Sequence, residues 1–284
     1  MEVRTADFAG SWYPADSTSC EREIKGFLRE GENYTLLGSE FIGGIVPHAG
    51  WYYSGSIACN VIHALSKGTL PEAIIVFGMH LHPGADLYIM ADGAWETPFG
   101  EIEIHRELAQ RLLQRFDFQV ETGRHHQPDN TIELQLPFIR YLFADVKIVP
   151  IGAPPTATAL EVGRAAADIA SELGLRIKVI GSTDLTHYGS NYGFTSRGSG
   201  PSAVNWVKNT NDSRIIDTML AMDPVKVIDE ALTHRNACCA GAAATAIAAA
   251  GRLGARRAQT VVYTTSYDKS PADSFVGYVG IVFD

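Results

Sequence analysis

The stretch FIGGIVP at residues 41–47 predicts a buried β-strand, because it is an apolar run that contains β-branched residues. A helical pattern follows at residues 54–66, and a second apolar run, AIIVFG, follows at residues 73–78. A strand, a helix and another strand in succession are typical of a parallel sheet covered by helices. This part of the chain therefore favours an α/β fold.

The same alternation continues over most of the chain. We expect further strands at residues 87–90, 146–151, 177–181, 259–266 and 275–283, and helices at residues 104–116, 130–143 and 157–173. Asn130 is the predicted N-cap of its helix, with Glu133 three residues later as in a capping box. Residues 190–214 are rich in Gly, Ser and Asn, and we expect either a mobile lid or a long surface connection there. The predicted fold class is α/β, with a single three-layer domain over residues 1–284 and a mainly parallel central sheet.

The composition excludes several classes of protein. Of the 284 residues, 46% are hydrophobic, and 32 Asp and Glu face 23 Lys and Arg, a formal net charge of −9. Disorder is therefore not expected, and the acidic balance argues against binding to a nucleic-acid backbone. The longest small-apolar stretch, residues 237–250, is shorter than the roughly 20 residues that span a bilayer. Without a visible signal peptide or disulfide framework, we expect a cytoplasmic protein with neither nucleic-acid nor membrane partners.

Histidines follow several of the predicted strands directly. His48 follows the first strand, His80 and His82 follow the strand at residues 73–78, and Asp184 and His187 follow the strand at residues 177–181. The carboxyl ends of parallel strands meet at one edge of an open sheet, where ligands bind. Each histidine alone is explained equally well as a cap or a buried group. Together they predict one polar crevice.

Cys238 and Cys239 precede an Ala-rich helix expected at residues 240–253. A helix N-terminus lowers the pKa of a thiol and favours the thiolate, which binds metals and attacks electrophiles. A free cysteine is also a common small hydrophobic residue in protein cores. From the residues alone both interpretations stay open, and the spacing does not match a Cys-x-x-Cys zinc pattern.

Short motifs spread over nearly the whole chain resemble those of one family. The segments are AGSWYP at residues 9–14, PHAGWYYSG at 47–55, IELQLPF at 132–138, STDLTHYG at 182–189, ACCAG at 237–241, SYD at 266–268 and VGY at 276–278. They are similar to motifs of the Memo family, also called component B of the AmmeMemoRadiSam system. The ACCAG segment corresponds to the family pattern A-C-G-x-G. Asn130 and Thr131 stand where the family commonly has His-Ser.

The resemblance implies an α/β fold related to the class III extradiol dioxygenases, and a mononuclear metal site with two histidines and one cysteine. Carried over to this chain, two of these ligands are His48 and Cys238. The second histidine of the family follows the glycine of the next strand by three residues, where this chain has Leu81. We assign this ligand to His80, with His82 as the alternative.

The resemblance also implies roles for two further residues. Asp184 and His187 match positions of the family pocket. We expect His187 to donate or accept a proton near the metal, and Asp184 to orient it or to act as its acid–base partner.

The function that the resemblance implies is that of a Memo-like metal-binding protein. Imidazole and thiolate suit iron, copper or zinc. We expect iron or copper, with redox or dioxygen-linked chemistry on a small molecule. The alternatives are a zinc hydrolase with the same ligands, and a non-catalytic module that holds a peptide or partner protein in the crevice. Family members occur together with AMMECR1-like and radical-SAM components, which are therefore the implied protein partners.

Overall fold

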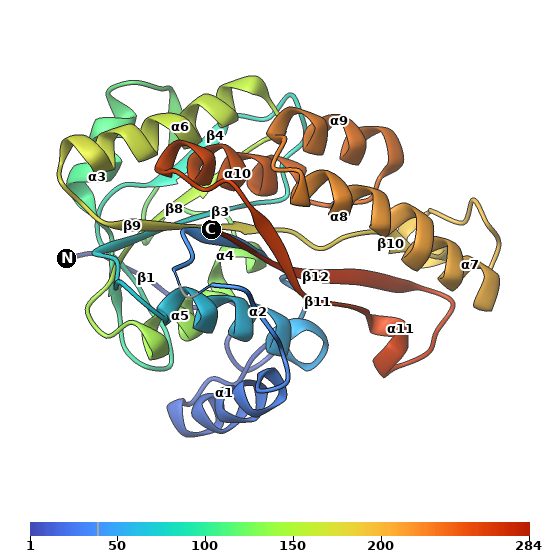
Figure 1. Cartoon of the computed structure of the whole chain (residues 1–284). Coiled ribbons are helices and arrows are strands. Elements are labelled where there is room, and N and C mark those ends of the chain that lie inside the picture. The colour runs from blue at the N-terminus through green and yellow to red at the C-terminus, as the bar shows by residue number, and fades with distance from the viewer. Residues whose placement is uncertain (39) are drawn as a thin grey trace.

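A central β-sheet lies between two layers of helices in the computed structural model, which describes residues 1–38 and 40–284 (Figure 1). The helices above the sheet in this view are α3 (Arg106–Leu113), α6 (Ala157–Glu172), α8 (Asp212–Leu220), α9 (Pro224–His234) and α10 (Ala240–Leu253). The helices below it are α1 (Ser17–Gly31), α2 (Trp51–Ser66), α4 (Asn130–Glu133) and α5 (Leu136–Leu142). The predicted three-layer α/β class is confirmed.

The centre of the sheet is parallel and its flanks are not. The strand order is β10-β12-β2-β9-β3-β8-β4-β7, with β11 paired to β12. The parallel strands at the centre are β2 (Gly43–Val46), β9 (Ile177–Ser182), β3 (Ala73–Gly78) and β8 (Lys147–Gly152). The outer strands are β4 (Leu87–Met90), β7 (Phe118–Glu121), β10 (His187–Tyr188), β11 (Ala258–Thr265) and β12 (Phe275–Phe283).

The antiparallel flanks follow from short connections. Strand β12 pairs with β2 and β11, and β4 pairs with β8, all in the antiparallel direction. Residues 79–86 join β3 to β4 and residues 266–274 join β11 to β12, and both connections are shorter than the crossover that parallel strands need. The strands expected at residues 73–78, 87–90 and 275–283 have those bounds in the structure. A mainly parallel sheet is thus confirmed for the part that carries the strand-end histidines.

Smaller elements complete the fold. A separate sheet is formed by β1 (Val3–Arg4), β5 (Ala94–Trp95) and β6 (Ile102–Glu103). The short helical elements are a 3₁₀ turn at Ser190–Tyr192, α7 (Pro201–Trp206), a π-helical turn at Val207–Asn211 and α11 (Ser266–Lys269). Much of the expected lid or connection at residues 190–214 is therefore helical. Val204 and Val207 pack with Tyr188 and Phe275, so this segment is a packed connection.

Small side chains let helix α10 lie close to the sheet and to α6. A Cβ atom at Gly181 of β9 would lie 2.8 Å from the carbonyl oxygen of Ala242. A Cβ atom at Gly163 of α6 would lie 2.5 Å from the carbonyl oxygen of Thr245. Neither position has room for a larger residue. This close packing holds the N-terminus of α10, with Cys238 and Cys239, beside the carboxyl end of β9.

The helix expected at residues 130–143 is divided into α4 and α5, and its predicted capping box is wrong. Asp129 caps α4, because its carboxylate accepts a hydrogen bond from the backbone N–H of Ile132. The Asn130 side chain instead donates to the carbonyl oxygen of His48, at 2.9 Å. Glu133 is fully buried and accepts hydrogen bonds from the backbone of Asp7 and Phe8. It therefore anchors the N-terminal segment rather than a helix end.

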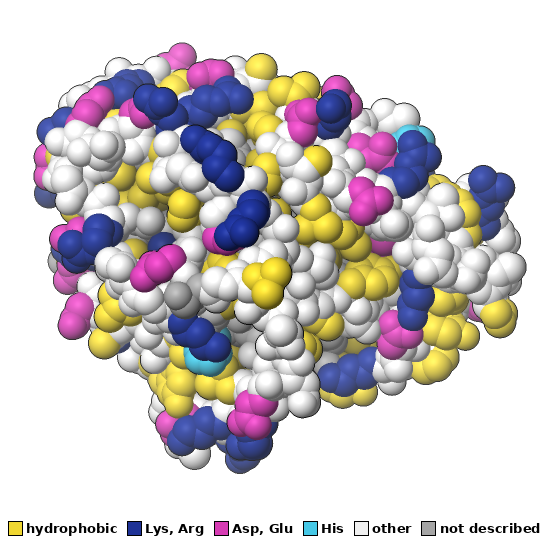
Figure 2. All heavy atoms as spheres, viewed as in Figure 1, with side chains coloured by type: hydrophobic (Ala, Val, Ile, Leu, Met, Phe, Trp, Pro, Cys, Tyr) yellow, Lys and Arg dark blue, Asp and Glu magenta, His cyan; other side chains and the backbone are white. Residues whose placement is uncertain are grey.

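The surface carries charges of both signs. Figure 2 shows Lys and Arg side chains interspersed with Asp and Glu on the face seen in Figure 1. In the described part of the chain, the structure contains no helix with the length and apolar character needed to cross a membrane.

Candidate metal centre

A cavity of about 580 Å³ lies at the carboxyl ends of the central strands. His48 after β2, His80 after β3, and Asp184 and His187 after β9 all line it. The prediction that the strand-end residues meet in one crevice is confirmed for these four residues and is wrong for His82. Four aromatic side chains at its wall are more than a third exposed to solvent: Trp12, Tyr52, Tyr53 and Tyr192.

Four metal-ligating side chains gather beside this cavity, and two of them, His48 and His80, line it. The donor atoms of His48, His80, Cys238 and Cys239 all lie within 4.8 Å of one another. The structure thus brings together the three residues expected to bind a metal and adds Cys239. His82 lies apart from this cluster, because it is exposed and its Nδ1 accepts a hydrogen bond from the backbone of Gly84.

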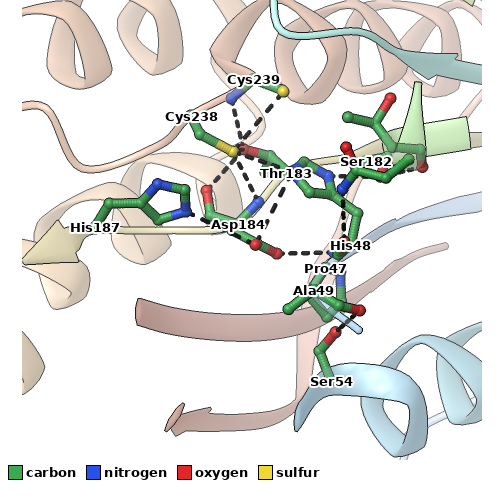
Figure 3. Close-up of polar contacts among 12 residues, drawn as sticks. Pro47, His48, Ala49, Ser54, Ser182, Thr183, Asp184, His187, Cys238 and Cys239 are labelled. Atoms are coloured by element: carbon green, nitrogen blue, oxygen red, sulfur yellow. Dashed lines mark hydrogen bonds and ion pairs between the residues drawn. The ribbon is translucent and has the colours of Figure 1, made fainter. Parts of the chain in front are cut away.

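A hydroxyl group fixes the orientation of the His48 imidazole (Figure 3). The Ser182 hydroxyl donates its proton to the carbonyl oxygen of Thr131 at 2.7 Å, and its oxygen lies 2.9 Å from His48 Nδ1. Ser182 must therefore accept a proton from Nδ1, which leaves Nε2 of a neutral imidazole free to bind a metal. Burial alone would lower the pKa of His48, but the negative charges of Asp184 and Cys238 outweigh it and raise the pKa to about 9.

The thiol of Cys238 lies directly against His48. Its Sγ is 3.2 Å from His48 Nε2 and accepts a hydrogen bond from the backbone N–H of Asp184 at 3.3 Å. The backbone N–H of Cys238 donates in return to the carbonyl oxygen of Asp184. Burial opposes ionisation, but the hydrogen bond with Cys239 and the charge of His48 hold the pKa of Cys238 well below its usual value. The structure therefore favours a thiolate here.

A strained backbone turns His80 toward the cluster. Met79 has a φ of 70°, which is uncommon for a residue with a side chain. Its N–H donates to the Thr131 hydroxyl at 2.7 Å, which helps to hold the turn. His80 Nδ1 lies 4.0 Å from a carboxylate oxygen of Asp129, and the His80 ring lies 4.9 Å from the His48 ring. This distance is too long for a hydrogen bond, so Asp129 lies near His80 without holding its ring.

Asp184 lies between the two histidines of the cavity wall. One of its carboxylate oxygens is 3.9 Å from His48 Nε2 and 3.8 Å from His187 Nε2, while the other accepts the backbone N–H of His48 at 2.7 Å. Burial would lower the pKa of His187, but the interaction with Asp184 and the charge of Cys238 raise it. Among the described residues, His187 Nε2 has no hydrogen-bond partner within normal distance. Nε2 is buried and lies beside the Asp184 carboxylate, so this geometry suits exchange of a proton between the two groups.

The sequence of this chain matches the model of the Memo-like protein family over residues 4–282. The chain belongs to the Memo-like family. A MEMO1 family protein of Thermococcus onnurineus is 35% identical over 293 residues, which cover 99% of both chains. A MEMO1 family protein of Methanosarcina mazei is 35% identical over 293 residues and covers the whole of both chains.

A solved structure shares the fold of this Memo-like chain. It is that of the uncharacterized protein JW3007 from Escherichia coli K12, with a TM-score of 0.56 and 13% sequence identity. The match covers 86% of this chain and 100% of the other. At this identity the likeness concerns the fold alone.

The donor set of this Memo-like chain fits a metal ion of intermediate or soft character. Imidazole nitrogen and thiolate sulfur bind iron, copper and zinc, whereas magnesium and calcium prefer oxygen. A buried thiolate is also costly unless a cation compensates its charge. The cluster is therefore chemically suited to hold one of the first three ions.

Sequence reasoning missed Ser182 and Asp129 and left the role of Cys239 open. Ser182 supports His48, Asp129 lies 4.0 Å from His80, and Cys239 contributes a fourth donor atom to the cluster. The contacts of Ser182 and Asp129 join residues far apart in the chain, so local spacing does not reveal them. Cys239 carried a signal, because ACCAG has cysteine where the family pattern A-C-G-x-G has glycine.

Proposed function

We propose that this protein holds one metal ion at His48, His80 and Cys238 and performs redox or dioxygen-linked chemistry on a small molecule. The observation that carries the proposal is the contact of 3.2 Å between Cys238 Sγ and His48 Nε2, with His80 in the same cluster. Iron or copper is the proposed metal, and zinc is the alternative. A cytoplasmic location belongs to the proposal, because a thiolate ligand must stay reduced.

The residues around the cluster support a reaction rather than storage of the metal. A bound iron or copper ion would supply electron transfer or the activation of dioxygen. His187 would hold or deliver a proton at Nε2, and Asp184 would stabilise the protonated imidazole from 3.8 Å. Tyr192 packs on His187, with ring centres 4.9 Å apart, and limits its movement.

The size of the cavity supports a small-molecule substrate. Its volume of about 580 Å³ lies within the range of small-molecule sites, roughly 300–1,000 Å³. Aromatic side chains form part of the wall, while His48, His80, Asp184 and His187 are among the polar groups that line it. A substrate would therefore be bound by apolar contact and oriented by polar groups.

Metal analysis tests the proposal. Protein purified without oxygen should contain about one iron, copper or zinc ion per chain, and His48→Ala, His80→Ala or Cys238→Ala should each remove most of it. His82→Ala is the matched control, because His82 lies two residues from His80 but outside the cluster. Unchanged metal content in all three ligand variants would refute the assignment.

A binding module is the second candidate, and one observation favours it. The exposed aromatic side chains Trp12, Tyr52, Tyr53 and Tyr192 offer contact area to a peptide or a partner protein. AMMECR1-like and radical-SAM proteins are the proposed partners. If these proteins co-purify with the chain and still do so after Cys238→Ala, the result would support this role. If the protein oxidises a catechol only when Fe²⁺ is present, the result would support the enzyme. Ester hydrolysis that requires Zn²⁺ would indicate the remaining alternative, a zinc hydrolase.

A further inference from the structure

We propose that Cys239 supplies a fourth ligand, so that the centre of this chain is a two-nitrogen, two-sulfur site selective for zinc or copper(I). The inference rests on the proposed metal centre and goes further, because it changes the donor set and the class of ion that the site selects. It concerns a residue that the A-C-G-x-G pattern does not contain.

The distances between the donor atoms carry the proposal. The sulfur atoms of Cys238 and Cys239 lie 3.8 Å apart, and the sulfur of Cys238 lies 3.2 Å from His48 Nε2. Two thiolates at about 2.3 Å from one tetrahedral zinc ion are separated by about 3.8 Å, and a thiolate and an imidazole by about 3.5 Å. Because all four donors lie within 4.8 Å of one another, small side-chain rotations suffice to enclose one ion.

The local backbone directs both sulfurs to the same place. The backbone N–H of Cys239 donates to the Thr183 hydroxyl at 3.0 Å, and that of Cys238 donates to the carbonyl oxygen of Asp184. Both thiols are thereby anchored to the segment that follows β9. Figure 3 shows the two sulfur atoms side by side above Thr183.

A pair of thiolates is stable here only around a metal ion, because burial and the charges of Cys238, Asp129 and Asp184 raise the pKa of Cys239 well above its usual value. Cys238 and Cys239 stand at the start of α10, where the helix dipole stabilises negative charge. Two thiolates neutralise one divalent ion, which removes the cost of burying a net charge. A neutral Cys239 that only fills space is the competing explanation, because its side chain is 2% exposed.

The arrangement leaves the centre open to the cavity. His48 and His80 line the cavity of about 580 Å³, whereas neither cysteine does. Cys238 lines a second cavity, of about 360 Å³, beside Leu185 and Ala237. The sulfurs therefore lie behind the imidazoles, and a four-coordinate ion can accept a fifth ligand from the side of the larger cavity.

Two thiolates change the expected selectivity. Sulfur ligands favour zinc and copper(I) over iron(II), which binds well to imidazole and oxygen donors. We therefore expect Cys239 to strengthen binding of Zn²⁺ and Cu⁺ with little effect on Fe²⁺.

X-ray absorption of the zinc-loaded wild-type protein tests the donor set without any substitution. We expect two sulfur neighbours at about 2.3 Å and two nitrogen neighbours at about 2.0 Å. A single sulfur neighbour would overturn the proposal.

Competition with a chelator tests the selectivity. Cys239→Ala should weaken Zn²⁺ binding by at least about 10-fold, since even the loss of a supporting partner costs about 10–100-fold. Its affinity for Fe²⁺ should stay within about threefold of the wild-type value, since iron(II) relies less on thiolate. Cys59→Ala is the control, because Cys59 is also a buried free thiol but lies outside the cluster.

The outcomes separate this inference from the function on which it rests. Unchanged Zn²⁺ affinity in Cys239→Ala, or one sulfur in the absorption spectrum, would refute the fourth ligand and leave the three-ligand centre intact. A wild-type protein that binds none of the three ions would refute both. If Cys239→Ala does not fold, the wild-type spectrum decides alone.

Discussion

At the scale of single residues, an uncharged hydroxyl group orients one of the proposed metal ligands. Ser182 is fully buried and has one proton, which it donates to Thr131, so it accepts from His48. This contact decides which nitrogen of His48 faces the metal. The sequence placed Ser182 directly after the strand predicted at residues 177–181 but did not reveal its partners, because His48 and Thr131 are distant in the chain.

Ser182→Ala should weaken metal binding by about 10–100-fold, because the His48 ring loses the acceptor that fixes its orientation. Chelator competition on folded protein measures this change. Ser66→Ala is the control, since Ser66 also bonds a backbone carbonyl but lies at the far end of α2. Equal affinity of both variants would contradict the role given to Ser182.

The burial of Asp212 makes the folding stability of the protein depend on pH. Asp212 is fully buried, accepts the N–H of Thr186 at 3.1 Å and the hydroxyl of Tyr263 at 2.7 Å, and burial raises its pKa to about 7. Because the folded protein binds this proton more tightly than the unfolded chain, folding stability falls as the pH rises from about 4 to 7.

Asp212→Asn should remove this part of the pH dependence. Both proteins are compared without metal. As the pH rises from about 4 to about 7, the unfolding free energy of the wild type should fall relative to that of the variant. Above about pH 7 the difference between the two should stay constant. The shift should be at most about 4 kcal/mol, at about 1.4 kcal/mol per pKa unit. Urea unfolding at several pH values measures it, and parallel curves would show that the carboxyl group does not titrate in this range.

At the scale of helices and strands, long apolar runs were predicted well and short polar segments were not. The runs at residues 73–78 and 275–283 are buried throughout, so hydrophobicity alone identified them. Glu133 was misassigned to a capping box because its real partners, Asp7, Phe8 and Tyr13, lie more than 100 residues away. The residues next to Glu133 in the sequence do not indicate these partners.

Glu133→Gln should destabilise the protein by about 1–3 kcal/mol, because a buried amide has one acceptor oxygen and cannot satisfy three donors. The N-terminal segment that carries Ser11 and Trp12 to the cavity wall should also exchange its amide hydrogens faster. Thermal unfolding and hydrogen exchange measure the two effects. Glu96→Gln, which changes an exposed glutamate that contacts Ala6 of the same segment, is the control.

At the scale of the whole molecule, the strand topology predicted where the candidate site lies. The rule that ligands bind at the carboxyl ends of parallel strands placed His48, His80 and Asp184 in one crevice before any distance was known. It left His80 and His82 as alternatives, since the turn after β3 depends on the unusual backbone of Met79. The proposed ligands follow β2 and β3 and precede α10, so a bound metal ion should stabilise the packing of these three elements.

Metal removal should therefore lower the thermal stability of the entire fold. With free metal at about 100 times its dissociation constant, binding adds about 2.7 kcal/mol of stability, which corresponds to a melting temperature higher by about 4–5 °C. Calorimetry of metal-free and reloaded protein measures this difference. In Cys238→Ala the two curves should coincide, and a persistent difference would place the stabilising metal elsewhere.

The positions of the ligands along the chain have a consequence for biosynthesis. His48 and His80 precede Cys238 by more than 150 residues, and strand β12, which pairs with β2, follows Cys238. On the ribosome, the two imidazoles emerge long before the thiolate that completes their site. A nascent chain would thus bind metal only weakly until Cys238 emerges, and tight loading would wait until β12 is in place.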